Sequence, residues 1–175
     1  MKERVCLPSG YKETGWRQEA SEELVWLGEQ YTGDLGDEAN LFVSARELAM
    51  WGHLHLTKGL IQGRQILPQK VFEQVTSMIS PPNLKPSLPR NGFFWFIQDI
   101  PRSKSELGDE LPSGSFQSLG ATGCVCLVIP QHHTVAVRMY NQVGPNPEGY
   151  DYLEDIKTFG NMVYSSIQGY EGKRE

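Results

Sequence analysis

Cysteine is scarce in this sequence, with only three among 175 residues, at positions 6, 124 and 126. An odd number of cysteines without zinc-type spacing argues against a disulfide-stabilised secreted scaffold, so we expect the thiols to be reduced. Long hydrophobic runs are also missing, which argues against a membrane span and against a secretory signal peptide. The default expectation is therefore a cytoplasmic protein, with the alternative that a full-length form carrying a further N-terminal part is exported.

An excess of positive charge is missing as well. Sixteen Lys and Arg stand against 21 Asp and Glu, which gives a net charge of -5 and a pI near 5.4. We therefore expect neither a nucleic acid nor an anionic membrane as partner. The sequence also lacks a phosphate-binding loop and a dinucleotide fingerprint, so no cofactor is predicted.

The candidate metal ligands do not form a set of suitable size. Cys124 and Cys126 share one face of a predicted strand, but two ligands do not make a metal site, and both are expected to be small buried apolar residues. His53 and His55 fall on a predicted helix, where a separation of two turns them apart. No metal is therefore predicted.

Apolar and aromatic residues are abundant enough for a core. The chain is 39% hydrophobic and has four Trp, seven Tyr and seven Phe, which predicts one domain over residues 1–175. Residues 1–90 form a loop-rich and helical part. Residues 91–170 form a part with antiparallel strands and a C-terminal helix.

Helices are predicted at two places in the first part. Ser44 and Glu47 have the spacing of a capping box, which begins a helix at Ala45 that runs to about Lys58. Pro68 suits the first turn of a second helix that ends before Pro81-Pro82. Its apolar face is expected to consist of Val71, Phe72, Val75 and Ile79. Residues 1–40 are interpreted as irregular, with a helical turn or two over residues 21–27.

Strands dominate the second part. Residues 92–99 are dense in aromatics, and Phe93 to Phe96 are expected to fill the core and a sheet face. Strands at 115–119, 122–129 and 133–141 follow, the last two joined by a tight turn at residues 130–132, so neighbouring strands are antiparallel. An amphipathic helix closes the chain, with apolar positions at Leu153, Ile156, Gly160, Val163 and Ile167. This order of elements predicts an α+β fold.

Four segments in this order resemble one protein family. They are Gly10-Tyr11-Lys12-Glu13-Thr14-Gly15-Trp16, the helix start at residues 40–52, Phe94-Trp95-Phe96, and Ser118-Leu119-Gly120 with the hairpin after it. Together they are similar to the C-terminal portion of the serine β-lactamase and penicillin-binding-protein-like hydrolases, in the class C β-lactamase and esterase-like branch. The resemblance spans about residues 10–168. It implies the C-terminal three strands of that family's sheet, the C-terminal helix packed on it and a partial helical region.

The resemblance also suggests site residues. The third active-site motif of the family, Lys-Thr-Gly or His-x-Gly, aligns with Ser118, Leu119 and Gly120, so a hydroxyl replaces the cationic or imidazole donor. The backbone amide of Ala121 would then stand at the oxyanion-donor position. The candidate catalytic positions are Ser118, Gly120 and Ala121. The alternative is structural: Gly120 marks close packing or a bulge, and Ser118 is a polar strand residue.

The nucleophile motif of the family is harder to locate. Its serine and lysine lie one helical turn apart so that they share a face, and a tyrosine assists. The Ser-x-x-Lys match here, Ser9 to Lys12, falls in a glycine-containing loop, and Tyr31 is best interpreted as a loop or packing residue. We therefore expect a truncated or degenerate homologue that is not catalytically competent alone.

Two other functions stay open. The chain could be part of a serine hydrolase of β-lactamase, esterase or D-amino-acid peptidase type, with its nucleophile in a missing N-terminal half or a companion chain. It could instead be a non-catalytic module that binds a small acyl or peptide-like ligand or a protein. A sheet that lacks its N-terminal strands has an uncovered edge, so we expect a homo-oligomer or a companion chain to cover it.

Overall fold

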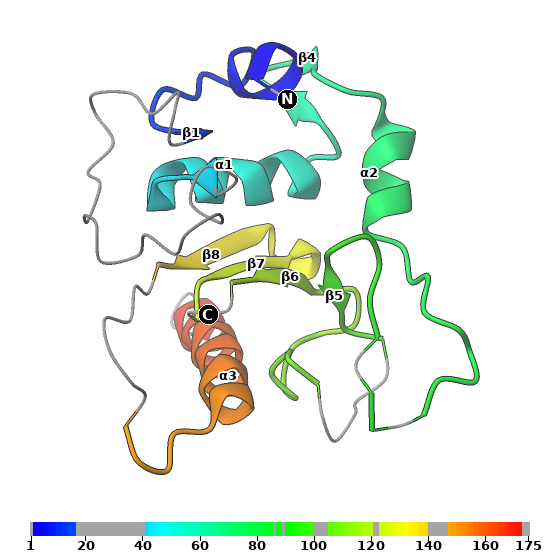
Figure 1. Ribbon diagram of the computed structural model, residues 1–175, viewed down its shortest axis with the longest axis vertical. Coiled ribbons are helices and arrows are strands. Elements are labelled where there is room, and N and C mark those ends of the chain that lie inside the picture. Colours follow the sequence, from blue (N-terminus) through cyan, green and yellow to red (C-terminus); the bar gives the residue numbers. More distant parts are fainter. Residues whose placement is uncertain are drawn as a thin grey trace, which may run out of the picture.

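The chain folds as a central antiparallel sheet between two helices in the computed structural model (Figure 1), which describes residues 2–16, 41–85, 87–88, 90–99, 105–120, 123–139 and 147–172. The sheet has the order β5-β6-β7-β8. These strands are Phe96–Ile97, Phe116–Leu119, Val125–Ile129 and Thr134–Arg138. Helix α1, Ala45–Leu56, covers one face, and helix α3, Tyr152–Glu171, covers the other. This arrangement confirms the predicted α+β fold.

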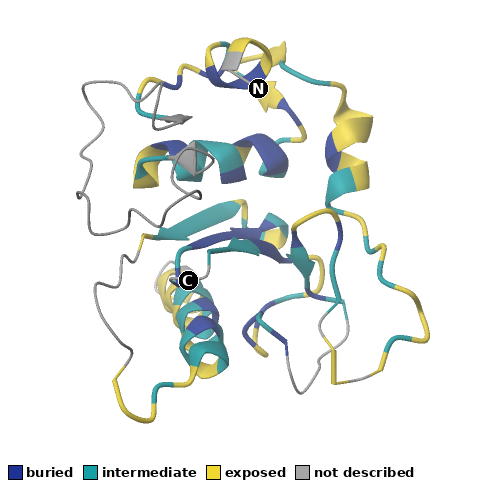
Figure 2. Cartoon of the chain, viewed as in Figure 1, coloured by how far each residue is buried: buried dark blue, intermediate teal, exposed yellow. Residues whose placement is uncertain are grey.

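Strand β7 forms the centre of the core, and all five of its residues are buried (Figure 2). Because side chains alternate along a strand, Val125, Leu127 and Ile129 pack with Ile156 of α3. Cys126 and Val128 belong to the opposite cluster, against which α1 packs. The sequence Val-Cys-Leu-Val-Ile is apolar throughout because both faces of this strand are covered.

The sheet differs from the prediction at one edge. The three expected C-terminal strands are β6, β7 and β8, and the 3-10 turn Pro130–His132 joins the last two as expected. The strand expected over residues 92–99 is reduced to β5, which adds a fourth strand by pairing with β6. It is short because the Gly92 amide donates to the Trp95 carbonyl at 2.8 Å, which closes a loop just before β5.

Two small two-stranded sheets were not predicted. Strand β1, Gly15–Trp16, pairs with β2, Leu41–Phe42, and β3, Leu60–Ile61, pairs with β4, Arg64–Gln65. A short π-helical turn, Lys2–Cys6, precedes them. The helical turn expected over residues 21–27 lies outside the described residues.

Helix α1 begins at its predicted residue, but only half of the expected capping box forms. The Ser44 hydroxyl accepts from the Glu47 amide at 3.2 Å. The Glu47 carboxylate does not return to Ser44; it accepts from the backbone amides of Lys12 and Glu13 and from the Thr14 hydroxyl. In a full capping box, this carboxylate would accept from the Ser44 backbone amide. It binds three donors of residues 12–14 instead, and these bonds fix the N-terminal segment to the start of α1.

These contacts determine the ionisation of Glu47, which is buried. Burial raises the pKa of the carboxyl, but the Thr14 hydroxyl, the backbone amides of Glu13 and Lys12 and the Arg46 guanidinium together bring it below its ordinary value. The carboxylate is therefore the stable form near neutral pH.

Helix α2, Gln69–Val75, is shorter than predicted. Phe72 is buried, as expected for its apolar face. Val71 and Ile79 are instead 38% and 50% exposed. Ile79 lies beyond the helix, which ends at Val75, and Val71 lies on its exposed side. The expected four-residue stripe therefore holds for Phe72 and the half-buried Val75 only.

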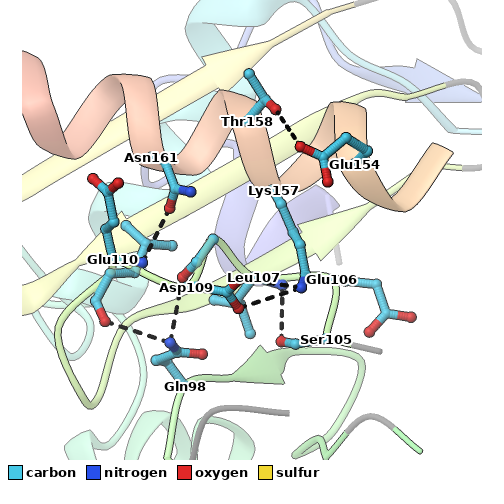
Figure 3. Close-up of polar contacts among 12 residues, drawn as sticks. Gln98, Ser105, Glu106, Leu107, Asp109, Glu110, Glu154, Lys157, Thr158 and Asn161 are labelled. Carbon is cyan, nitrogen blue, oxygen red and sulfur yellow. Dashed lines mark hydrogen bonds and ion pairs between the residues drawn. The ribbon is translucent and has the colours of Figure 1, made fainter. Parts of the chain in front are cut away.

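Helix α3 packs on the sheet through Ile156, Val163 and Ile167 of its predicted stripe, and Asp151 caps it by accepting from the amides of Leu153 and Glu154. Gly160 of the stripe instead meets Gly108 and Leu111 of the loop before β6, which packs along the helix (Figure 3). The Asn161 side-chain oxygen accepts from the Glu110 amide at 3.1 Å, and Gln98 donates to the carbonyl of Gly108 at 3.3 Å. These bonds join β5, the loop and α3 into one body. Within the described part of the chain, no helix is long and apolar enough to cross a membrane.

Candidate functional site

Ser118 and Leu119 lie in the wall of a surface cleft of about 470 Å³. This volume falls in the range of small-molecule sites. The cleft is formed by the end of β6, by the loop before β5 and by the chain after α2. Its lining residues are Ile79, Asn91, Gly92, Phe93, Phe94, Phe96, Ser118 and Leu119.

The cleft exists because β6 is longer than the strand beside it. Strand β5 pairs with β6 only through Phe96 with Gln117 and Ile97 with Phe116, so Ser118 and Leu119 extend beyond it. Hydrogen bonding alternates along an antiparallel strand. The Gly120 amide donates to the Cys124 carbonyl at 2.8 Å, between β6 and β7. The neighbouring residue, Leu119, therefore has its amide and carbonyl directed away from β7, toward the open edge of β6. Strand β6 therefore offers backbone groups to the cleft.

Gly120 and Gly123 close the turn that follows β6. The Gly123 amide donates to the Gly120 carbonyl at 2.9 Å, and Gly123 has φ +84, a conformation that favours glycine. The expected structural role of Gly120 in close packing is consistent with its fit against Cys124, whose Cβ would lie 3.3 Å from an added Cβ. Ala121, the candidate oxyanion donor, lies outside the described residues.

A charged pair holds this turn against α3. Arg138, the last residue of β8, donates from Nε to the Gly123 carbonyl at 3.0 Å and makes two bonds to the Asp155 carboxylate at 3.1 and 2.9 Å. The Tyr150 hydroxyl donates to the same carboxylate at 2.8 Å. Burial raises the pKa of Asp155, but the Arg138 and Tyr150 hydrogen bonds outweigh it and lower the pKa. The position of the turn is thus set by a bidentate ion pair.

Nothing in the described wall of the cleft activates Ser118. Its side chain is half-buried, and its hydroxyl makes no hydrogen bond to a described residue. The described lining residues include no lysine, histidine, tyrosine or carboxylate. Nucleophilic attack by a serine needs a base within hydrogen-bond reach, and none of the described lining residues can act as that base.

The Ser-x-x-Lys match does not supply the missing groups. Ser9 is 5% exposed and lies in the turn after the π-helical segment, whereas Lys12 is exposed and its backbone amide is bound by Glu47. One side chain points inward and the other outward, and neither lines the cleft. The interpretation of this segment as something other than the nucleophile motif agrees with this geometry. Tyr31 lies outside the described residues.

The cysteines and histidines do not form a metal site in the described part of the chain. Burial raises the pKa of the Cys126 thiol to about 12, so this thiol stays protonated near neutral pH. His55 is buried and its pKa is lowered by burial, although its bond to the Trp51 carbonyl opposes the shift. His53, two residues earlier, is exposed, so the two rings point apart as predicted.

The aromatic wall of the cleft was missed by sequence reasoning. Phe93 to Phe96 were expected in the core, and Trp95 is buried there at 4% exposure. Phe93 and Phe94 are instead 52% and 92% exposed and line the cleft. The available signal was Asn91-Gly92, a turn dipeptide that interrupts the strand before the aromatics.

The fold, an antiparallel sheet between helices, is that of the β-lactamase-fold proteins. The Beta-lactamase family matches residues 1–157. The chain therefore belongs to the Beta-lactamase family.

A relative and two solved structures extend this finding. An uncharacterized protein of Alkalihalophilus pseudofirmus is 46% identical over 167 residues, which cover 90% of this chain and 49% of the relative. A β-lactamase from Mycobacterium bovis has a TM-score of 0.63 at 16% identity, over 95% of this chain and 54% of that one. A Bacillus anthracis protein provisionally named a 6-aminohexanoate-dimer hydrolase has a TM-score of 0.55 at 21% identity. The match covers 76% of this chain and 30% of that one. The chain spans about half the length of the relative that it matches.

Proposed function

We propose that these 175 residues are the C-terminal part of a β-lactamase-family serine hydrolase and do not hydrolyse a substrate on their own. The composition of the cleft wall is the main support for this proposal. Ser118 and Leu119 stand in its wall at the third-motif position, yet the described lining has no base for a nucleophile. The buried Ser9 and exposed Lys12 also do not form the required pair. The part contributes one wall of a ligand site, with Ser118, Gly120 and Ala121 at its third motif.

Covalent labelling tests this proposal. The isolated chain, treated with a fluorophosphonate probe, is expected to show no labelling above that of Ser9→Ala and Ser118→Ala variants. Turnover of a chromogenic cephalosporin and of a p-nitrophenyl ester should stay at the rate in buffer. Stoichiometric labelling that one serine substitution abolishes would contradict the proposal. Ligand binding without labelling would instead favour a non-catalytic binding module.

A second candidate is a composite enzyme, and the outer edge of β8 favours it. No described strand pairs with this edge, because β8 pairs only with β7. Beside it lies a second cleft of about 510 Å³ with a mixed apolar and polar lining: Arg46, Ala49, Met50, His53, Leu56, Ile61, Gln62, His133 and Val135. Unpaired strand edges are typical places for a further polypeptide to pair. A companion chain that carries Ser-x-x-Lys would complete the sheet here.

Complementation tests the composite enzyme. The half of the Alkalihalophilus relative that this chain does not match would be co-expressed with it and labelled with the fluorophosphonate. Labelling of the companion only in the complex is the expected result. Ala121→Pro, which removes the candidate oxyanion amide, should then lower turnover about 10²- to 10³-fold, whereas Ala121→Ser, which keeps the amide, should not. Equal loss in both variants would contradict the oxyanion role.

A further inference from the structure

Phe94 has a backbone conformation that its side chain does not favour. Its φ is +60, in the left-handed region of backbone conformation. Glycine adopts this region without strain, whereas a bulky residue rarely does. The side chain is 92% exposed, so burial in this fold does not offset the strain. A strained residue whose side chain adds nothing to packing points to a function for that side chain.

The surrounding loop imposes this conformation. The Phe93 amide donates to the Val75 carbonyl at 3.2 Å, and the Gly92 amide donates to the Trp95 carbonyl at 2.8 Å. A Cβ on Gly92 would lie 2.5 Å from the Ser77 carbonyl oxygen, so the loop and the end of α2 are in close contact. On its other side the loop is anchored by Trp95, whose ring packs edge-on against Phe116. Phe94 is therefore presented by a loop held at both ends.

Other apolar side chains gather at the same place. Ile79 and Phe93 are 50% and 52% exposed, and both line the cleft together with Phe94. Three exposed apolar residues around one cleft are a typical mark of a binding site. They form its rim, while Ser118 and the outward-facing backbone of Leu119 form its opposite wall.

The chemistry of the lining limits the ligand. None of the described lining residues carries a charge, and the polar groups are the Asn91 amide, the Ser118 hydroxyl and backbone groups. A carboxylate or phosphate would meet no cationic side chain there. A neutral amide or ester with an apolar ring meets a hydrogen-bonding wall at one end and aromatic faces at the other.

We infer that Phe94, together with Phe93, recognises an aromatic group on a neutral acyl compound whose carbonyl end lies toward Ser118. The inference rests on the proposed function in taking this cleft as the ligand site, but it requires no catalysis by the isolated chain. Phe94 is a specificity-determining residue in this role. Its strain is explained by use of the ring in binding.

Two measurements on one substitution test the inference. Phe94→Gly relieves the positive φ, so its midpoint of thermal unfolding should equal or exceed that of the wild type. Binding would be followed by NMR titration with N-phenylacetylglycinamide and N-acetylglycinamide, which differ in the aromatic ring. The wild type should prefer the phenylacetyl compound about tenfold, with shifts in the amides of residues 118–120, and Phe94→Gly should lose most of this preference.

Met162→Gln is the matched control, because Met162 is 65% exposed on α3 and does not line the cleft. It should keep the wild-type preference. A lower unfolding midpoint in Phe94→Gly would overturn the inference and make the ring structural. Equal affinities for the two compounds, no binding of either, or a preference retained in Phe94→Gly would overturn it as well. Covalent labelling of a serine in the isolated chain would contradict the proposed function but leave the predicted ring preference unchanged.

Discussion

At the scale of single residues, Glu47 has hydrogen-bond partners that sequence spacing did not suggest. Its distance from Ser44 predicted a capping box, and the Ser44 half of the box is present. The carboxylate instead binds residues 12–14, which are more than 30 positions away. A local pattern identified the residue as important for the helix start, but its actual partners come from a segment that only the fold brings close.

Replacement of this carboxylate gives a prediction about pH. Because the folded-state pKa of Glu47 lies below its ordinary value of 4.5, the ionised group stabilises the fold above pH 4.5, and this contribution is lost as the pH falls through the folded-state pKa. Glu47→Gln should lower the free energy of unfolding by about 1–2 kcal/mol at pH 7, and the difference should shrink below pH 4.5. Urea denaturation at pH 7, 5 and 3.5 measures it.

Glu73→Gln is the control for this measurement. Glu73 accepts from Gln69 and pairs with Lys58, but its side chain is 47% exposed, and exposed ion pairs contribute little. Its substitution should leave the unfolding midpoint nearly unchanged. A loss in Glu47→Gln that is no larger than in Glu73→Gln, or that does not vary with pH, would contradict the role assigned to Glu47.

At the scale of elements, α1 approaches the sheet through a glycine. A Cβ on Gly52 would lie 2.6 Å from Val135 of β8 and 2.9 Å from the sulfur of Cys126 in β7. Both distances are shorter than real Cβ contacts allow, so the helix would have to move away from the sheet. The helix pattern in the sequence shows an internal glycine here but not the strand residues that require it.

Gly52→Ala tests this contact. Alanine favours a helix by about 1 kcal/mol over glycine, but overpacking of the core costs about 1–3 kcal/mol. The substitution should therefore give no gain in the free energy of unfolding, or a loss of up to about 2 kcal/mol. Gly169→Ala in α3 is the matched control, because nothing lies within 4 Å of its added Cβ, and it should stabilise the protein. Thermal unfolding of both variants is the measurement, and a gain of equal size in both would contradict the tight contact.

At the scale of the whole molecule, the outer edge of β8 pairs with no described strand. Because Val125, Leu127 and Ile129 of β7 bond to β8, the amides of Val135 and Val137 point away from β7. The strand has no proline, lysine or glycine, which are common means of protecting an edge. We propose that a second copy or a companion chain pairs with this edge.

Light scattering with two substitutions at one position tests this association. The isolated chain should behave as a dimer or larger assembly at high concentration. Val137→Pro removes the outward amide and should give monomers, whereas Val137→Ala removes side-chain packing, keeps the amide and should retain assembly. A clean monomer in the wild type, or equal assembly in both variants, would contradict pairing through β8.

Much of the fold follows from local patterns in the sequence. The alternation and apolar character of residues 115–138 predicted three strands in their observed order, and the 3- and 4-residue spacing of apolar positions from Leu153 to Ile167 predicted α3. The strand expected over residues 92–99 was predicted too long because sequence periodicity does not reveal that Gly92 bonds to Trp95. That one loop bond turns Phe93 and Phe94 outward, so the candidate site was only half predicted.

The sequence by itself determined the order of helices and strands, the family resemblance and the motif at Ser118 to Gly120, because these depend on neighbours within a few positions. Only the tertiary structure decided which residues share the cleft, since Ile79, Phe94 and Ser118 are brought together by packing between distant segments. The same holds for the partners of Glu47 and for the free edge of β8. Such contacts depend on how whole elements pack, and no local spacing encodes them.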